Sequence, residues 1–286
     1  NDPEDLIDWI INNKENMKPR IIAMYLPQFH PIPENDEWWG KGFTEWTNVV
    51  KAKPLFKGHY QPHLPADLGF YDLRLPEVRE QQAELAREAG IEGFCYYHYW
   101  FGNGKQLLER PFNEVLASGK PDFPFCICWA NHDWTNKTWV KGKSTRRDSM
   151  IMKMEYSTED HIAHFNAMLP AFRDKRYITV DGKPLFAIYQ PKAIPNVKQF
   201  IELWQKMAKE NGLKGIHFVG YTVNSSGRSV KDGKLSLWAT DEAAEHYQSV
   251  LDLGFDAVMP SGLARAQSMS KGKLRMLFYF LTKNSF

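Results

Sequence analysis

One carboxylate stands among large aromatic side chains in the segment from Trp38 to Trp46. Glu45 lies between Thr44 and Trp46, and Trp39 precedes it by six positions. The flat face of an indole packs well against the apolar face of a pyranose ring. A carboxylate beside it can accept hydrogen bonds from sugar hydroxyls or transfer a proton. This combination predicts a carbohydrate-binding cleft, with Glu45 as a candidate catalytic residue.

A second candidate carboxylate is Asp133. It follows the apolar run 123–130 and directly precedes Trp134. Hydrolysis of a glycosidic bond usually needs two carboxylic acids, one to protonate the leaving oxygen and one to act as base or nucleophile. Glu45 and Asp133 are therefore the available catalytic pair. Aspartates also cap turns and helices, so a purely structural role for Asp133 is an equal alternative.

Short apolar segments alternate with amphipathic ones along the chain. Strands are expected at 20–26, 91–99, 123–130, 185–190, 216–222 and 255–259, and helices at 76–89, 105–118, 157–172, 195–211 and 241–253. Such alternation predicts parallel strands joined by crossover helices. Unbroken apolar strands fit a sheet that is covered on both faces. We expect an α/β fold of the (β/α)₈ TIM-barrel type, with about six βα units evident in this chain.

In β/α barrels the site forms at the carboxyl ends of the strands. Substrate-binding candidates that follow this rule are Tyr25, Gln28, His30, Trp38, Trp39, Trp46, His98, Tyr99, Trp100, Asn131, Trp134 and Tyr189. The first two strands should be neighbours, so we expect the loop around Glu45 to approach residues 98–100. His98 alternates with two tyrosines, and only one of the two strand faces can point inward. His98 is therefore either a site residue or a core histidine.

Composition narrows the classes of function. A chain of 286 residues can bury a sizeable core in one α/β domain, and a formal charge of +2 does not suggest a nucleic-acid partner. Cys95, Cys126 and Cys128 lie in apolar strand-like runs. An odd number of cysteines argues against a disulfide framework, and no second Cys/His pair has zinc-site spacing. We expect buried thiols, a reducing compartment, no metal site and no cofactor.

Two segments are expected: a lead-in helix over residues 1–19 and a barrel domain over 20–286. The absence of a visible signal peptide favours a cytoplasmic protein, although the chain starts at Asn1 rather than at a methionine. The longest late apolar stretch, 276–281, is too short to span a membrane. The basic centre of the segment 131–156 fits either a solvated loop or a lid over an anionic glycan.

Five motifs in order along the chain resemble the WbsX-like family, which is also called glycoside hydrolase family 99-like and is linked to bacterial surface polysaccharides. They are Tyr25-Leu-Pro-Gln-Phe-His30, Gly42-Phe-Thr-Glu-Trp46, Tyr60-Gln-Pro-His-Leu-Pro65, Gly93-Phe-Cys-Tyr-Tyr-His-Tyr-Trp100 and Cys128-Trp-Ala-Asn131. The resemblance extends over residues 20 to 260. It implies the same barrel fold and a protein that binds or processes an oligosaccharide or polysaccharide.

This chain departs from the family pattern at two places. Related enzymes carry two catalytic glutamates in a C-terminal Asn-Glu-Trp-x-Glu-Gly-like motif, and their proposed mechanism uses the 2-hydroxyl of the sugar itself. That motif is absent here, and Asp256 is the last acidic residue. The family usually has Asn-Glu-Asn-Trp where this chain has Asn131-His-Asp-Trp134, which moves a carboxylate by one position. We expect a C-terminally incomplete barrel that hydrolyses little or nothing alone.

Three functions stay open at this point. The first is a glycoside hydrolase acting on bacterial surface or O-antigen polysaccharide. The second is a glycosyltransferase of lipopolysaccharide or capsule biosynthesis, which the lack of an Asp-x-Asp motif in a nucleotide-binding context disfavours. The third is a non-catalytic glycan-binding remnant, which the missing glutamate pair favours. Six strands would also leave open parallel edges, which invite cover by the tail, self-association, or completion within a longer protein.

Overall fold

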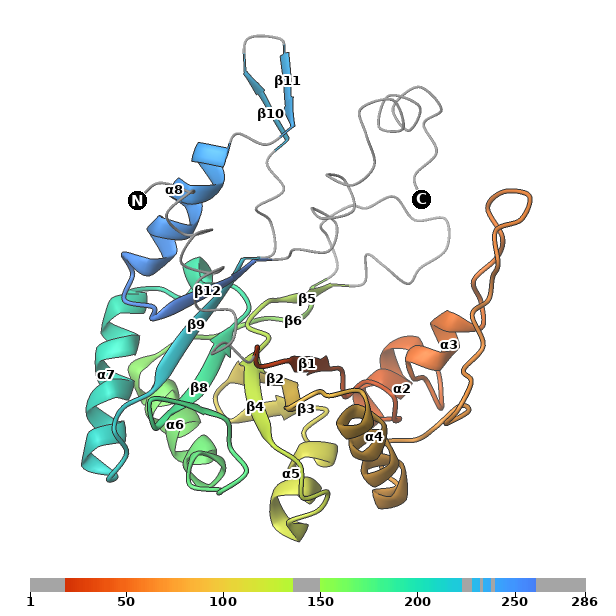
Figure 1. Cartoon of the computed structure of the whole chain (residues 1–286), viewed down its shortest axis with the longest axis horizontal. Helices are drawn as coiled ribbons and strands as arrows, with labels where there is room; N and C mark the ends of the chain where they lie inside the picture. The colour runs from red at the N-terminus through yellow and green to blue at the C-terminus, as the bar shows by residue number, and fades with distance from the viewer. Residues whose placement is uncertain (1–18, 136–149, 223–227, 232–233, 238–239, 261–286) are drawn as a thin grey trace.

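The computed structural model describes residues 19–135, 150–222, 228–231, 234–237 and 240–260 and shows an α/β fold (Figure 1). Its centre is one curled parallel sheet, in the order β1 (Ile22–Tyr25), β2 (Gly93–Gly102), β4 (Phe125–Trp129), β8 (Lys183–Ile188), β9 (His217–Thr222) and β12 (Ala257–Pro260). The order in space follows the order in sequence, as successive βα units require. All six expected strands are confirmed. Within the described part, β1 and β12 are the two edges of the parallel sheet.

Helices surround the outside of the curled sheet (Figure 1). They are α4 (Pro76–Glu88), α5 (Arg110–Ser118), α6 (Thr158–Phe172), α7 (Val197–Glu210) and α8 (Thr240–Leu251). Two short helices, α2 (Pro33–Trp39) and α3 (Glu45–Val49), lie in the segment between β1 and α4, and a 3₁₀ turn, η2 (Pro191–Ala193), follows β8. Proline at the start of α4 and α5 fits the first helical turn, where its missing N–H costs nothing. None of the helices in the described ranges is long and apolar enough to cross a bilayer.

Several short antiparallel strands accompany the main sheet. They are β3 (Lys105–Leu107) beside β2, β7 (Thr179–Val180) beside β8, the pair β5 (Trp134–Thr135) and β6 (Met150–Met152), and the pair β10 (Arg228–Lys231) and β11 (Lys234–Leu237). The helix expected from residue 105 therefore begins only at Arg110. Gly102 and Gly104 have φ of +104° and +72°, and they turn the chain back so that β3 pairs with β2.

The two faces of the sheet differ in burial. In β9 the side chains of Phe218 and Thr222 point outward and are buried, whereas His217, Val219 and Tyr221 point inward and are half-buried. Strand alternation produces this pattern because the helices cover only the outer face. The three cysteines are buried and unpaired, which confirms the expected thiols. The lead-in helix, the basic residues at 141–147 and the stretch 276–281 lie outside the described residues.

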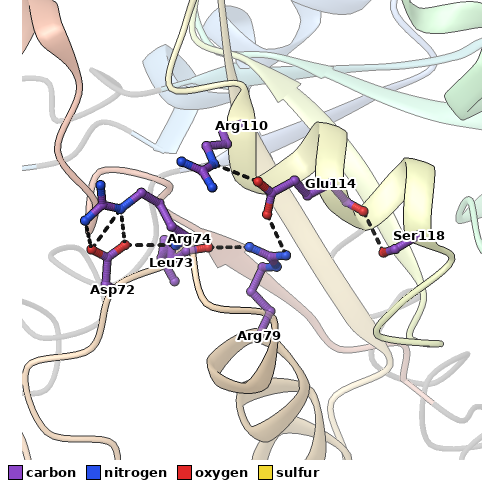
Figure 2. A network of polar contacts seen from close by, with 7 residues as sticks. All are labelled: Asp72, Leu73, Arg74, Arg79, Arg110, Glu114 and Ser118. Carbon is purple, nitrogen blue, oxygen red and sulfur yellow. Dashed lines mark hydrogen bonds and ion pairs between the residues drawn. The ribbon is translucent and has the colours of Figure 1, made fainter.

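A network of arginines and carboxylates fastens the long connection after α3 to the helix layer (Figure 2). The guanidinium of Arg79, in α4, donates to the carbonyl of Leu73 and pairs with Glu114 of α5 at 2.8 Å. Arg79 is 3% exposed. Arg110 approaches the other oxygen of Glu114 at 2.6 Å but is half exposed. These bonds hold the end of the connection, at Leu73, against α4 and α5.

A pair of buried histidines lies between the sheet and α6. The Nε2 atoms of His98 and His164 are 3.0 Å apart, so one ring donates and the other accepts. The ring of Trp100 stacks on His164 with a centroid distance of 4.6 Å. Burial lowers the pKa of His98 to about 4 and holds the pKa of His164 well below its usual value. Both rings are therefore neutral in the folded protein at neutral pH.

This pair predicts loss of stability in mild acid. Unfolded histidine takes up a proton below a pH of about 6.5, but folded His98 does so only near about 4. Within that window the unfolded state binds more protons, so the free energy of unfolding should fall as the pH falls. The His98→Gln variant keeps a hydrogen-bonding side chain and should make this slope shallower by about 1.4 kcal/mol per pH unit. Urea unfolding at several pH values measures the slope, and equal slopes in both proteins would contradict the prediction.

Candidate functional site

A cleft of about 270 Å³ lies where the segments after β1 and β4 meet. Its lining comprises Gln28, Asn35, Trp39, Phe43, Glu45, His132, Asp133, Trp134 and Thr135. These residues follow the carboxyl ends of two strands that flank β2, which is where parallel α/β folds place their ligands. A larger hollow of about 600 Å³ beside the start of α7 has neither a carboxylate nor an aromatic ring in its described lining. The first cleft is the stronger candidate.

Glu45 is held at the cleft by the start of α3. Its backbone N–H donates to the carbonyl of Gln28 at 3.2 Å, which ties α3 to the segment that leaves β1. The Glu45 carboxylate is half-buried, and its one hydrogen bond in the described part is a long contact of 3.5 Å from Asn48. Burial raises the pKa of Glu45, and the contact with Asn48 only partly opposes this shift. The carboxylate thus has spare capacity to accept hydrogen bonds.

Gln28, Tyr99 and Trp134 join the cleft to β2. The carboxamide Nε2 of Gln28 donates to the hydroxyl of Tyr99 at 3.2 Å. The indole of Trp134 meets the ring of Tyr99 edge-on at a centroid distance of 5.1 Å and that of Trp38 at 6.1 Å. The loop around Glu45 was expected to approach residues 98–100, and Tyr99 does contact this part of the protein. Trp134 owes its position to β5, which pairs with β6.

Two polar side chains at the cleft lack partners in the part of the chain that the structure describes. Asn35 is 2% exposed, and its Nδ2 donates to no described group; the Nδ1 of His132 is also buried without a partner. Burial lowers the pKa of His132, although nearby Asp133 opposes the shift. Buried polar groups are usually hydrogen-bonded; atoms of His30, Arg79, His161 and His164 also lack partners among the described residues, but of this set Asn35 and His132 are the two that line the cleft beside Glu45. No sequence motif pointed to Asn35.

Asp133 and Asn131 have structural partners. One carboxylate oxygen of Asp133 accepts a hydrogen bond from the backbone N–H of Met154 at 2.7 Å, although the side chain remains exposed. The carboxamide of Asn131 makes two bonds to the backbone of Gln190, at 2.7 and 2.9 Å, and is fully buried. Asn131 therefore fastens the end of β4 to the end of β8. Asp133 borders the cleft but is partly engaged.

Tyr25, His98 and Trp100 lie on the outer face of the sheet, away from the cleft. The Tyr25 hydroxyl donates to Gln82 of α4 at 2.6 Å, and the Trp100 indole donates to the carboxylate of Asp160 in α6. We expected these three residues to bind substrate in the cleft. That expectation is wrong, because side chains alternate between the two faces of a strand. The register places Tyr97 and Tyr99 on the inner face, so His98 and Trp100 must point outward.

Other expected residues support the cleft or extend it. His30, expected to bind substrate, is buried at 1% exposure and is not among the described lining residues of the cleft. Trp46 packs on Phe29, and its indole N–H donates to the carbonyl of Tyr71 at 2.8 Å, so it stabilises the loop. Tyr189 lies 5.2 Å from His132 and stacks on Tyr221 at 5.0 Å, as measured between ring centroids. Tyr189 thus continues an aromatic surface from the cleft along the inner face.

The fold and the cleft define an α/β protein with an aromatic and polar cleft at the carboxyl ends of its strands. The family model described as "Glycosyltransferase WbsX" matches residues 21–275. The chain belongs to this WbsX family. It is also similar to the "Uncharacterized protein WxcX" of Xanthomonas campestris pv. campestris in two strains, at 44% identity over 203 residues. That match covers 71% of this chain and 28% of the relative, so the chain spans little more than a quarter of its length.

Solved structures with a similar arrangement are distant. A "Glycoside hydrolase-like protein" has 13% identity and a TM-score of 0.44, covering 72% of this chain and 53% of that chain. The GH99 endo-alpha-mannosidase from Bacteroides thetaiotaomicron has 13% identity and a TM-score of 0.39, covering 86% and 84%. Likenesses at this level do not bear on the chemistry of this chain.

Proposed function

We propose that this chain forms the glycan-binding part of the active cleft of an enzyme that acts on bacterial surface polysaccharide, most simply a glycoside hydrolase. One observation carries the proposal. A half-buried carboxylate, Glu45, shares a small cleft with the indole of Trp39 and with two buried polar groups, on Asn35 and His132, that lack described partners. A pyranose ring offers an apolar face for the indole and several hydroxyls for these polar groups.

Each group has a distinct role in this proposal. The ionised carboxylate of Glu45 accepts hydrogen bonds from two sugar hydroxyls, and the Nδ2 of Asn35 donates to a ring or hydroxyl oxygen. Trp39 supplies the stacking face. Hydrogen bonds to a charged group in a shielded site are worth about 1.5–3 kcal/mol each. Glu45 therefore binds and orients the glycan.

Glu45 binds the glycan in this scheme, so cleavage of the glycosidic bond requires carboxylic acids other than Glu45. Asp133 is the other carboxylate in the described lining, but it already accepts the N–H of Met154. We therefore assign the proton transfers to carboxylates outside the described residues. We also propose that the sheet is completed to an eight-stranded barrel, either by further chain or by self-association across β1 and β12.

A glycosyltransferase is the second candidate, because the printed description of the family names one. The two candidates differ in what the cleft should bind. A transferase should bind a nucleotide sugar, and the nucleotide alone should compete for the site. A hydrolase-type cleft should bind a free oligosaccharide and ignore the nucleotide. Saturation-transfer NMR with uridine diphosphate sugars and with oligosaccharides separates the two.

Replacing Trp39 with alanine should weaken oligosaccharide binding about tenfold, because the stacking face is lost. The Trp39→Phe variant keeps an aromatic face and should retain most of the affinity. The measurement is calorimetric titration with oligosaccharides released by mild acid from a bacterial O-polysaccharide. Trp38, which contacts Trp134 but is absent from the lining, provides the matched control as Trp38→Phe. Equal affinity for the wild type and Trp39→Ala would contradict the role of Trp39.

A further inference from the structure

The connection between α3 and α4 extends away from the body of the molecule (Figure 1). It carries large apolar side chains that have no cover: Leu55 is 70% exposed, Tyr60 65% and Leu64 59%. Val50 and Phe56 are also exposed. Scattered exposed apolar residues are ordinary, but a cluster on one protruding segment marks an interaction site. The candidate cleft involves none of these residues.

The first part of this connection, residues 50–66, is basic. It contains Lys51, Lys53 and Lys57 and no aspartate or glutamate. All three lysines are exposed, and within the described residues none of them forms an ion pair. Apolar and cationic side chains therefore alternate over a short distance, and the segment presents a net positive charge together with its apolar groups.

Local contacts present these side chains in a defined turn. The backbone N–H of Leu55 donates to the Nδ1 of His59 at 3.2 Å, and the N–H of His59 donates to the carbonyl of Phe56 at 3.1 Å. The rings of Phe56 and His59 stack at 4.6 Å, and Tyr60 meets His63 at 4.9 Å. These contacts all lie within residues 55–63, and Leu55, Tyr60 and Leu64 remain exposed.

We infer that this connection, residues 50–66, binds the surface of an anionic membrane. Leu55, Tyr60 and Leu64 would enter the headgroup region, and the lysines would lie against anionic headgroups. The charge decides between this partner and a second protein. Lysine is depleted in the cores of protein interfaces, whereas a mixture of lysine with leucine and aromatic residues is typical of membrane-surface segments. The inference is independent of the proposed function of the cleft.

The test is co-sedimentation of the 286-residue chain with vesicles of phosphatidylcholine, with and without phosphatidylglycerol. We expect binding to the mixed vesicles only, weakened by high salt. Changing Lys51, Lys53 and Lys57 together to glutamine should lower the partition coefficient on the order of 100-fold. The control changes the exposed Lys198, Lys206 and Lys209 of α7 to glutamine, which alters the net charge equally. Equal losses in both triple variants would overturn the inference.

The apolar part of the inference has its own test. Leu55→Asp should abolish vesicle binding, whereas Leu85→Asp, at an exposed position on α4, should not. Because the native cysteines are buried, an environment-sensitive dye can label Leu64→Cys selectively, and its emission should shift to the blue on mixed vesicles alone. Failure of the wild type to bind vesicles would overturn the inference. So would a dimer in solution that Leu55→Asp converts to a monomer, because the segment would then be a protein interface.

Discussion

The Trp204→Ala variant should lose about 3–5 kcal/mol of its free energy of unfolding. Trp204, in α7, is fully buried, and its ring lies within 4.9 Å of both Phe186 and Phe200 and within 5.4 Å of Phe165, measured between centroids. Its indole N–H also donates to the carbonyl of His161 at 3.0 Å. Alanine would leave a cavity among rigid aromatic rings and would remove the hydrogen bond between α7 and α6. Denaturant unfolding followed by circular dichroism measures the loss.

Two further variants make the result specific to this position. Trp204→Phe keeps most of the ring volume and removes the hydrogen bond, so it should cost clearly less than Trp204→Ala. Leu85→Ala, at an exposed position of α4, should change stability by less than about 0.5 kcal/mol. A loss below about 1 kcal/mol for Trp204→Ala would show that the packing of α6 and α7 on the sheet is not organised around this ring.

The second large effect is expected at the ion pair between α4 and α5. Glu114→Ala removes the carboxylate that faces the buried guanidinium of Arg79 and leaves that cation with the Leu73 carbonyl as its described partner. A buried charge without its counter-ion is costly, and the expected loss of unfolding free energy is about 3 kcal/mol. The same denaturant experiment applies.

Arg110 supplies the matched comparison. It bonds the other oxygen of Glu114, but its side chain is 55% exposed, so Arg110→Ala should cost less than about 1 kcal/mol. The Arg79→Met, Glu114→Leu double variant removes both buried charges and should recover part of the loss of Glu114→Ala. Equal costs for Arg110→Ala and Glu114→Ala would contradict the importance that we assign to the buried position of Arg79.

The main sheet was predictable because each parallel strand is a nearly unbroken apolar run. Phe125–Trp129, for example, is buried at every position, so its hydrophobicity alone marks it. The short antiparallel strands were not predictable. Lys105–Leu107 has three residues and no alternation, and its conformation depends on the positive φ values of Gly102 and Gly104. Turn geometry of that kind leaves a weak trace in sequence, so the helix was expected five residues too early.

The candidate site was predictable in its location more than in its members. The motif around Glu45 and the residues after β4 do meet in one cleft. His98 and Trp100 could not be assigned, because a period of two tells which residues share a face but not which face points inward. Asn35 carries no motif at all. Its significance rests on burial without a partner among the described residues, which is a property of the folded chain.

The pKa of Glu45 separates a binding role from a structural one. Burial raises this pKa, which means that the folded chain holds the proton of Glu45 more tightly than the unfolded chain. The charged form therefore costs stability at neutral pH, once the pH exceeds the unfolded value. Glu45→Gln should leave the melting temperature unchanged or raise it slightly. If the Glu45 carboxylate stabilised the fold instead, Glu45→Gln would lower the melting temperature.

The most direct test compares wild type and Glu45→Gln for both glycan binding and stability, with Glu37→Gln as the control at an exposed glutamate nearby. Calorimetric titration with O-polysaccharide oligosaccharides should show binding to wild type that strengthens as the pH rises through the raised pKa of Glu45. Glu45→Gln should bind at least tenfold more weakly, without that pH dependence and without loss of melting temperature, and Glu37→Gln should match wild type. Undiminished oligosaccharide affinity in Glu45→Gln, or no binding by wild type at any pH, would contradict the proposed glycan-binding cleft.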